Sequence, residues 1–215
     1  MSLKKINIIP TGDEIFNGVV IDTNSTAIMQ IILENFPRCK ITREKPVIDD
    51  EIKILEKINS CVEKSSDLII IIGGSGGGYR FDPTLAKDYT HSAIIQYLNK
   101  YTSREIYGKN GHLWSKIVFG KKDATIITNV PGPYVEAKAA AMVLIESLKN
   151  DEKDINVICD KMANAILSKY PSKAGIKCVM ELSNHGLGPR RIANVLNRKG
   201  IDIKYYQVAY RLKTK

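Results

Sequence analysis

The sequence is 215 residues long, 44% hydrophobic and 26% charged, close to the average of globular proteins, which excludes wholesale disorder. No apolar run approaches the roughly 20 residues that cross a bilayer, and no signal peptide begins the chain, so we expect a cytoplasmic protein without a membrane segment. The four cysteines form no CxxC pair and the three histidines form no HExxH motif, which argues against a zinc site and a disulfide framework.

The net charge of +9 is distributed unevenly along the chain. Residues 1–150 carry 19 basic and 17 acidic side chains, whereas residues 151–215 carry 13 and 6. A charged segment with helix-breaking residues lies between them at 150–154, so we expect one domain over 1–150 and a small basic helical domain over 151–215. Concentrated positive charge of this kind favours nucleic acid or another polyanion as a partner.

In chain order, the apolar pattern predicts alternating strands and helices up to about residue 150. The expected elements are a strand over 4–10, a loop over 11–23, a helix up to 35, a strand near 38–45, a second helix, a strand over 68–72, a helix over 83–98, strands over 115–120 and 124–130, and a helix over 135–148. The run 68–72 is apolar throughout, as in a central parallel strand covered on both faces. The alternation predicts an α/β fold with three layers, α/β/α, and a mostly parallel sheet.

Two of these helices begin with polar residues that are suited to capping. Asn24 or Ser25 is expected to cap the first, and Asp49 or Asp50 the second. The apolar residues of the second helix are spaced so that they are expected on one buried face. They are Ile52, Leu55, Ile58 and Val62.

Three loops follow predicted strands, and ligands of open α/β sheets bind beyond the carboxyl ends of the strands. Their candidate binding residues are Thr11, Gly12, Asp13, Glu14, Asp22 and Asn24 in the first loop, Gly73, Gly74, Ser75 and Gly76 in the second, and Pro131 and Gly132 in the third. The second loop has five glycines in residues 73–78, which lets backbone N–H groups approach a phosphate or a flat heterocycle. It has neither the Walker lysine nor the GxGxxG spacing, and a plain surface loop is the alternative.

Several polar side chains in these loops have two interpretations. Asp82 directly precedes Pro83, so it suits the cap of a helix, and equally a Mg²⁺ ligand beside a phosphate-binding loop. Asp22 and Asn24 stand at an ordinary helix start, for which capping is the simpler interpretation. Asp13 and Glu14 are adjacent and do not form a simple acid/base pair. The spacing of these residues alone does not identify a reaction.

Taken together, these loops resemble the molybdopterin-binding domain family over residues 3 to about 150. The motifs that carry the resemblance are Thr-Gly-Asp-Glu-Ile, Asp-Thr-Asn-Ser, Gly-Gly-Ser-Gly and Val-Pro-Gly-Pro, in this order. The family includes molybdopterin adenylyltransferase, the insertase domain of gephyrin-like proteins and the competence-damage-inducible proteins. The resemblance implies a three-layer α/β fold, often a trimer, that binds pterin phosphate at the glycine loop and, in the adenylyltransferases, MgATP.

The resemblance also assigns roles to individual residues. Asp82 matches a functional acid and metal ligand, and Asp49 or Asp50 matches a second functional carboxylate. Ser75 and the pair Asp82–Pro83 depart from the family's pattern. These departures affect the expectation of adenylyl transfer more than the expectation of pterin binding. The expected function is therefore molybdopterin binding in molybdenum-cofactor biosynthesis, with MgATP-dependent adenylyl transfer as its catalytic form. A nucleotide-cleaving enzyme and a molybdopterin- or nucleotide-sensing DNA-binding regulator are the alternatives.

The basic C-terminal segment has a pattern of its own. A glycine-containing turn at 186–188 precedes a helix that begins at Pro189, and a last helix is expected over 204–213. This resembles a helix-turn-helix of the recombinase type, with three tyrosines on the second helix. The candidate nucleic-acid contacts are Arg190, Arg191, Arg198, Lys204 and Arg211. The alternative is a helical appendage for docking or for assembly of a dimer or trimer.

Overall fold

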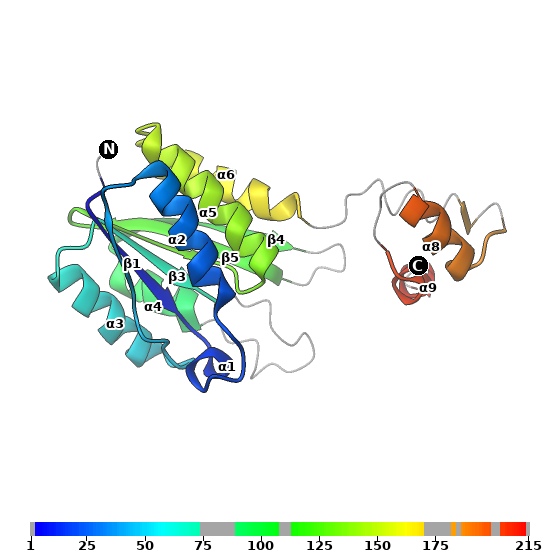
Figure 1. Ribbon diagram of the computed structural model, residues 1–215, viewed down its shortest axis with the longest axis horizontal. Coiled ribbons are helices and arrows are strands. Elements are labelled where there is room, and N and C mark those ends of the chain that lie inside the picture. Colours follow the sequence, from blue (N-terminus) through cyan, green and yellow to red (C-terminus); the bar gives the residue numbers. More distant parts are fainter. Residues whose placement is uncertain are drawn as a thin grey trace. The chain divides into compact units, whose positions relative to one another are not determined.

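The computed structural model describes residues 3–73, 89–107, 113–169, 182–183, 186–198 and 203–213. The chain forms two compact units, Met1–Lys169 and Tyr170–Lys215 (Figure 1). Among the described residues, no helix is long and apolar enough to cross a membrane.

The first unit is built on one six-stranded sheet with the order β2-β1-β3-β6-β5-β4. Its elements are β1 (Lys5–Pro10), α1 (Asp13–Phe16), α2 (Thr23–Asn35), β2 (Lys40–Arg43), α3 (Glu51–Glu63), β3 (Leu68–Ile72), α4 (Tyr89–Tyr97), β4 (Lys100–Tyr107), β5 (Leu113–Lys122), β6 (Thr125–Val130), α5 (Tyr134–Lys149) and α6 (Ile155–Leu167). Strands β2, β1, β3 and β6 are parallel, while β5 is antiparallel to both β6 and β4. The predicted α/β fold is confirmed, and its sheet is mixed.

The core of the sheet lies at β1, β3 and β6, as the apolar run over 68–72 predicts. Every residue of β3 and β6 is buried. Helices α2, α5 and α6 cover one face of the sheet and α3 and α4 the other (Figure 1). A strand covered on both faces has no solvent side, which explains why β3 has no polar alternation.

Helix α3 begins as expected, and its buried face differs from the predicted one at Ile52. The Asp50 carboxylate accepts a hydrogen bond from the Lys53 N–H and is the cap. The buried side chains are those of Ile54, Ile58 and Cys61, whereas Ile52 is 65% exposed, so the predicted face is wrong at that residue. Each i+3 step falls about 60° short of a full turn, so a pattern of such steps drifts around the helix.

The loop after β1 is more ordered than its sequence indicates. It contains the short helix α1, which was not predicted. At its end the Asp22 carboxylate accepts a hydrogen bond from the Ser25 N–H at 3.0 Å and caps α2. The interpretation of Asp22 as a helix cap is thus confirmed, whereas the cap expected at Asn24 or Ser25 is wrong. The second Asp22 oxygen pairs with Arg43 at 2.9 Å, which ties α2 to the edge strand β2.

Two further elements complete this unit. Strand β4 was not predicted, because it is a mostly polar edge strand that pairs only with β5. Helix α6 packs against α5, β4 and β5 and buries one apolar face. The sequence places a domain boundary near 150, and the compact unit of the structure continues through α6 to Lys169.

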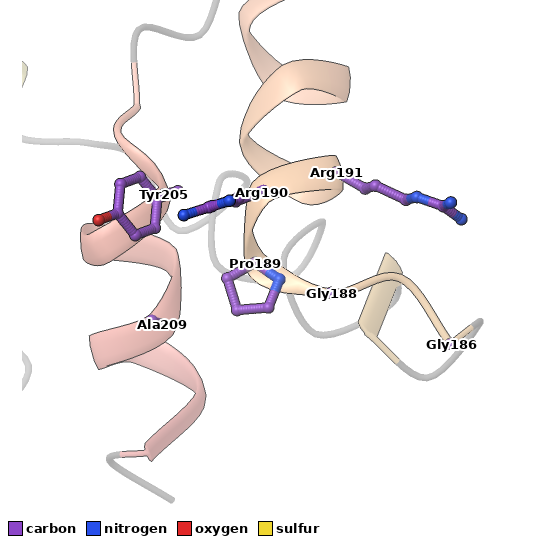
Figure 2. Close-up of a pocket in the computed structure, with 7 residues that line it drawn as sticks. All are labelled: Gly186, Gly188, Pro189, Arg190, Arg191, Tyr205 and Ala209. Atoms are coloured by element: carbon purple, nitrogen blue, oxygen red, sulfur yellow. The ribbon is translucent and has the colours of Figure 1, made fainter.

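The second unit contains the two helices expected there, α8 (Pro189–Arg198) and α9 (Tyr205–Lys213). Buried Ile192, Leu196 and Val208 lie in the small apolar core that they share. The Asn197 side chain fixes the start of α9: its amide donates to the Ile203 carbonyl at 3.1 Å, and its oxygen accepts from the Ile203 N–H at 2.9 Å. A groove lies beside the first turn of α8 (Figure 2).

Candidate functional site

The three predicted loops begin at one edge of the sheet. Strands β1, β3 and β6 are neighbours and run parallel, and their last residues, Pro10, Ile72 and Val130, are in register. Thr11, Gly73 and Pro131 therefore leave the sheet side by side. The sequence analysis expected the three loops at the same end of the sheet, because the carboxyl ends of parallel strands share an edge.

Thr11 and Gly73 form the buried floor of this edge. The Thr11 N–H and hydroxyl both donate to the Ile72 carbonyl, at 2.8 and 2.9 Å, and the Gly73 N–H donates to the Val130 carbonyl at 3.1 Å. Gly73 has φ +98°, and a Cβ there would lie 2.9 Å from the Thr11 hydroxyl and 3.1 Å from its carbonyl oxygen. Only glycine fits this position without a shift of the backbone.

Thr90, in the first turn of α4, is a member of the site that the sequence did not indicate. Its hydroxyl lies 3.3 Å from the Thr11 hydroxyl, in hydrogen-bonding contact, and both residues are buried. The two side chains are 79 positions apart, and no local pattern marks Thr90. Gly74, Ser75, Gly76 and Asp82, which sequence reasoning placed in this loop, lie outside the described residues.

A group of carboxylates lies beside the floor. The Asp13 carboxylate of α1 accepts a hydrogen bond from the Asp49 N–H at 3.1 Å. The pKa of Asp49 is raised above its ordinary value, first by burial and then by the negative charges of Asp13 and Glu14, while a backbone hydrogen bond with Asp13 opposes the shift. Asp50 caps α3, so it is Asp49 that joins the carboxylates of the first loop.

The first and third loops are tied together by Asn24. Its side-chain amide donates to the Gly132 carbonyl at 2.6 Å. Its side-chain oxygen is buried and has no hydrogen-bond partner among the described residues. Both oxygens of Asp22, two residues earlier, are already engaged by Ser25 and Arg43, so Asp22 holds this corner in place.

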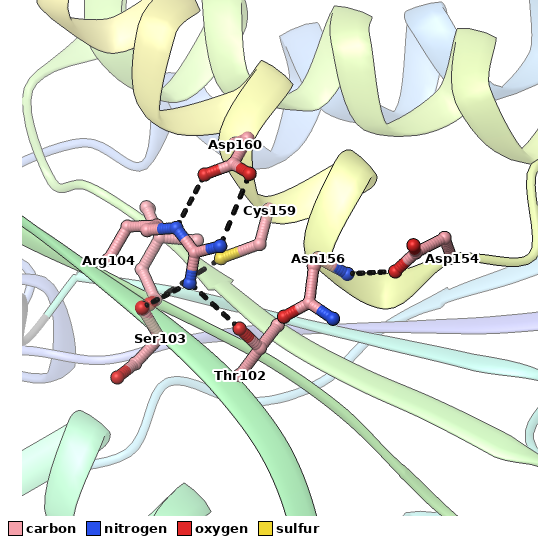
Figure 3. A network of polar contacts seen from close by, with 8 residues as sticks. Thr102, Ser103, Arg104, Asp154, Asn156, Cys159 and Asp160 are labelled. Carbon is pink, nitrogen blue, oxygen red and sulfur yellow. Dashed lines mark hydrogen bonds and ion pairs between the residues drawn. The ribbon is translucent and has the colours of Figure 1, made fainter.

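Another polar network lies on β4 and α6, away from these loops (Figure 3). The Arg104 guanidinium pairs with both Asp160 oxygens, at 2.5 and 3.2 Å, and also donates to the Thr102 hydroxyl at 2.9 Å. The pKa of Asp160 is lowered by its hydrogen bond with Arg104. All of its groups are satisfied within the chain, so the network anchors α6 to the edge strand and offers no reactive group.

The predicted nucleic-acid contacts lie in the second unit. Arg190, Arg191 and Lys204 are exposed. The Arg190 guanidinium carbon lies 5.2 Å from the centre of the Tyr205 ring, a cation–π contact. Arg198 and Arg211 lie on α8 and α9, and their side chains are outside the described part of the structure.

Comparisons with known proteins agree on the first unit. Residues 7–150 match the family model described as a probable molybdopterin-binding domain. No curated protein matches the chain.

Solved structures share the fold at low sequence identity. The molybdopterin biosynthesis enzyme MoaB of Thermus thermophilus is 20% identical with a TM-score of 0.55, and the match covers 74% of this chain and 98% of that one. CinA of Thermoplasma acidophilum, described as of unknown function, is 17% identical with a TM-score of 0.52, covering 70% and 99%. The molybdopterin biosynthesis Mog protein of Mycobacterium ulcerans is 22% identical with a TM-score of 0.51, covering 72% and 99%.

The family model covers well over half of the chain and includes all three loops of the candidate site. The resemblance seen in the sequence is thereby confirmed: this chain belongs to the molybdopterin-binding domain family.

Proposed function

We propose that the first unit binds molybdopterin in molybdenum-cofactor biosynthesis, at the edge formed by Thr11, Gly73 and Gly132. The observation that carries the proposal is the bare backbone at this edge. Gly73 takes a conformation reserved for glycine, and among the described residues the atom nearest to a Cβ on Gly132 would be the Gly73 Cα, at 3.9 Å. Two glycines that face each other leave room for a ligand to reach the backbone.

The phosphate of the ligand is assigned to the glycine loop that begins here. The N–H groups of Thr11 and Gly73 are already bonded to sheet carbonyls, so they are not available to it. The proposed donors are the N–H groups of Gly74, Ser75 and Gly76. Asn24, whose buried oxygen has no partner in the described part of the chain, is the proposed acceptor for a ligand N–H group.

The proposed reaction is adenylyl transfer from MgATP to this phosphate. A phosphate oxygen of the pterin forms a bond to the α-phosphorus of ATP, the bond between the α-phosphorus and the bridging oxygen breaks, and pyrophosphate leaves. Such chemistry needs mainly positioning and neutralisation of charge. No covalent nucleophile of the protein is required.

The carboxylates of the first loop fit a magnesium ion. The described residues contain no set of three metal-ligating side chains, but Mg²⁺ usually takes one or two protein carboxylates together with phosphates and water. The pKa of Asp49 is raised first by burial and then by the negative charges of Asp13 and Glu14, and a cation would relieve the second of these causes. Asp49 and Asp13 are the proposed ligands, with Asp82 as a further one, and the ion would supply charge neutralisation to the phosphates.

The test is a calorimetric titration with molybdopterin, with and without MgATP, and a parallel measurement of AMP incorporation. Asp49→Asn should abolish the Mg²⁺-dependent part of the measured binding and of AMP incorporation. Asp50→Asn is a matched control, because asparagine also caps helices. Asp82→Ala should abolish transfer. Binding without transfer would favour a carrier or sensor, cleavage of a nucleotide would favour the hydrolytic alternative, and no binding would overturn the proposal.

We propose a second activity, binding of DNA, for the second unit. Tyr170–Lys215 carries ten basic and two acidic side chains, a net charge of +8, whereas Met1–Lys169 carries 22 and 21, a net charge of +1. Helices α8 and α9 follow one another along the chain and pack together, which supports the proposal of a helix-turn-helix.

The measurement for this activity is affinity for labelled DNA at several salt concentrations. A phosphate contact by Arg191 predicts that Arg191→Ala lowers the slope of log K against log salt by about one. Lys153→Ala, in the first unit, is the control for a general loss of charge. If the protein shows no affinity for DNA at low salt, this proposal is wrong.

The proposal also includes a homo-oligomer, a trimer or a dimer, as in many members of the family. Large apolar side chains are exposed on the first unit at Ile21, Leu33 and Met142, with exposed fractions of 83%, 46% and 52%. Light scattering at several protein concentrations measures the assembly, and a monomer at every concentration would contradict it.

A further inference from the structure

The second unit has a groove of about 600 Å³ where α8 begins. Its lining residues are Gly186, Gly188, Pro189, Arg190, Arg191, Tyr205 and Ala209. The lining contains no carboxylate, and none of the residues described in this unit is acidic. The groove therefore suits an anionic ligand.

One wall of the groove is an aromatic ring with a cation against it. The Tyr205 side chain is 50% exposed, and the Arg190 guanidinium lies 5.2 Å from the ring centre (Figure 2). Tyr206 packs edge-on against the same ring, at 5.9 Å between centres. Both contacts are made by the Tyr205 ring, whereas the Arg191 side chain points away from Tyr205 (Figure 2).

Gly186 and Gly188, which also line the groove, have no side chains that would narrow it. Within the described part of this unit, a Cβ at Gly186 or Gly188 would meet no atom within 4 Å. The groove is open on this side, and Tyr205, Arg190 and Arg191 all belong to its lining.

The exposed tyrosines continue along α9 beyond the groove. Tyr206 is 58% exposed and Tyr210, one helical turn later, is 62% exposed. In a duplex the faces of the bases are stacked on one another, so a protein reaches only their edges. Exposed aromatic faces contribute most when the bases are unpaired, because every base can then stack on them.

We infer that this groove binds an unpaired nucleotide of a single-stranded nucleic acid, with its base stacked on Tyr205 and its phosphate attracted by the two arginines that line the groove, Arg190 and Arg191. The inference rests on the proposed nucleic-acid function of the second unit and specifies the form of the partner. Arg190 supports the ring from one side and adds a positive charge beside the phosphate. Tyr206 and Tyr210 offer stacking surfaces to the next bases.

The experiment is fluorescence anisotropy of the full-length protein with a labelled oligodeoxythymidylate of about 20 nucleotides, longer than the roughly 4–16 that single-strand-binding folds cover. A duplex of the same length is titrated at the same salt concentration. The single strand should bind more tightly than the duplex. Tyr205→Leu should weaken it about tenfold, which is about 1.4 kcal/mol, with the salt slope unchanged.

Two further variants make the result specific. Arg190→Lys keeps the charge but loses the flat guanidinium, and it should also weaken single-strand binding. Tyr134→Leu, on α5, replaces a tyrosine that is 45% exposed in the first unit, and it should have no effect. Circular dichroism and the retained salt slope show that each variant is folded.

The outcomes separate this inference from the broader proposal. If the duplex binds as tightly as the single strand and Tyr205→Leu changes neither, the inference fails while DNA binding stands. If the affinity for the single strand falls with salt but does not change in Tyr205→Leu, binding depends on charge alone, and the inference also fails. If neither nucleic acid binds at low salt, both proposals fail.

Discussion

Replacing Gly73 with alanine tests the geometry of the proposed ligand site most directly. The φ of +98° lies outside the left-handed region that other residues occasionally use, and strain of this kind costs about 1–3 kcal/mol. The new methyl group would also lie 3.1 Å from the Thr11 carbonyl oxygen, and crowding in a packed site costs about 1–3 kcal/mol more. Alanine makes the unfolded chain less flexible, which offsets about 0.4–1 kcal/mol. We expect a net loss of about 3 kcal/mol.

Two other glycines serve as matched controls. Gly18 also has a positive φ, +71°, but no atom lies within 4 Å of its Cβ position, so Gly18→Ala carries the strain alone and should cost about 1 kcal/mol. Gly132→Ala carries neither strain nor crowding, so the stiffer unfolded chain should make it more stable by about 0.4–1 kcal/mol. It places a methyl group opposite Gly73, however, and should weaken molybdopterin binding.

Urea denaturation followed by tryptophan fluorescence measures these free energies of unfolding. The single tryptophan of the chain, Trp114, lies in β5, so its signal reports on the first unit. If Gly73→Ala costs no more than Gly18→Ala, the contact with Thr11 contributes nothing and the argument for a crowded floor is refuted. If Gly73→Ala costs about 3 kcal/mol yet binds molybdopterin normally, the site lies elsewhere.

Three further results are expected. Because its pKa is raised, ionised Asp49 lowers stability at neutral pH; Asp49→Asn should raise the melting temperature at about pH 7, and the gain should vanish as the pH falls below the ordinary Asp value of about 3.9. The pKa of His91 is lowered to about 4, mainly by burial and then by Lys116; stability should therefore fall as the pH drops from about 6.5 to 4, and His91→Gln should remove that dependence in pH-resolved melts. Met162→Ala, in the buried face of α6, should destabilise the first unit by about 2–4 kcal/mol, whereas Leu167→Ala, which is 49% exposed, should cost less than about 0.5 kcal/mol; equal effects in denaturation would show that α6 is not part of that unit.

The sequence predicted the centre of the sheet well because burial on both faces leaves an unambiguous pattern. Leu68–Ile72 is apolar at every position, and the structure has a strand at those residues. The edge strand Lys100–Tyr107 was missed because only a few of its side chains are buried, so polar residues are tolerated there. In α3, Ile52 shows that an apolar residue near a helix start need not face the core.

The candidate site was predicted in its loops but not in its details. Parallel strands carry their loops to one edge, so Thr11, Gly73 and Gly132 could be grouped from the order of strands and loops along the chain. Asp49 and Asp50 could not be told apart, because both precede the same helix and only the three-dimensional arrangement shows which one caps it. Thr90 depends on a tertiary contact, which no spacing in the sequence encodes.

The division of charge between the two units also has a consequence for work in solution. At about 0.1 M salt the field of a charge fades over about 10 Å, so the near-neutral first unit exerts little long-range attraction on a dissolved phosphate ester. The proposed ligand affinity of the first unit should therefore respond weakly to ionic strength, while the proposed nucleic-acid affinity of the second unit, which has a net charge of +8, should respond strongly. Raising the salt concentration should therefore weaken nucleic-acid binding by the second unit while leaving ligand binding by the first unit nearly unchanged.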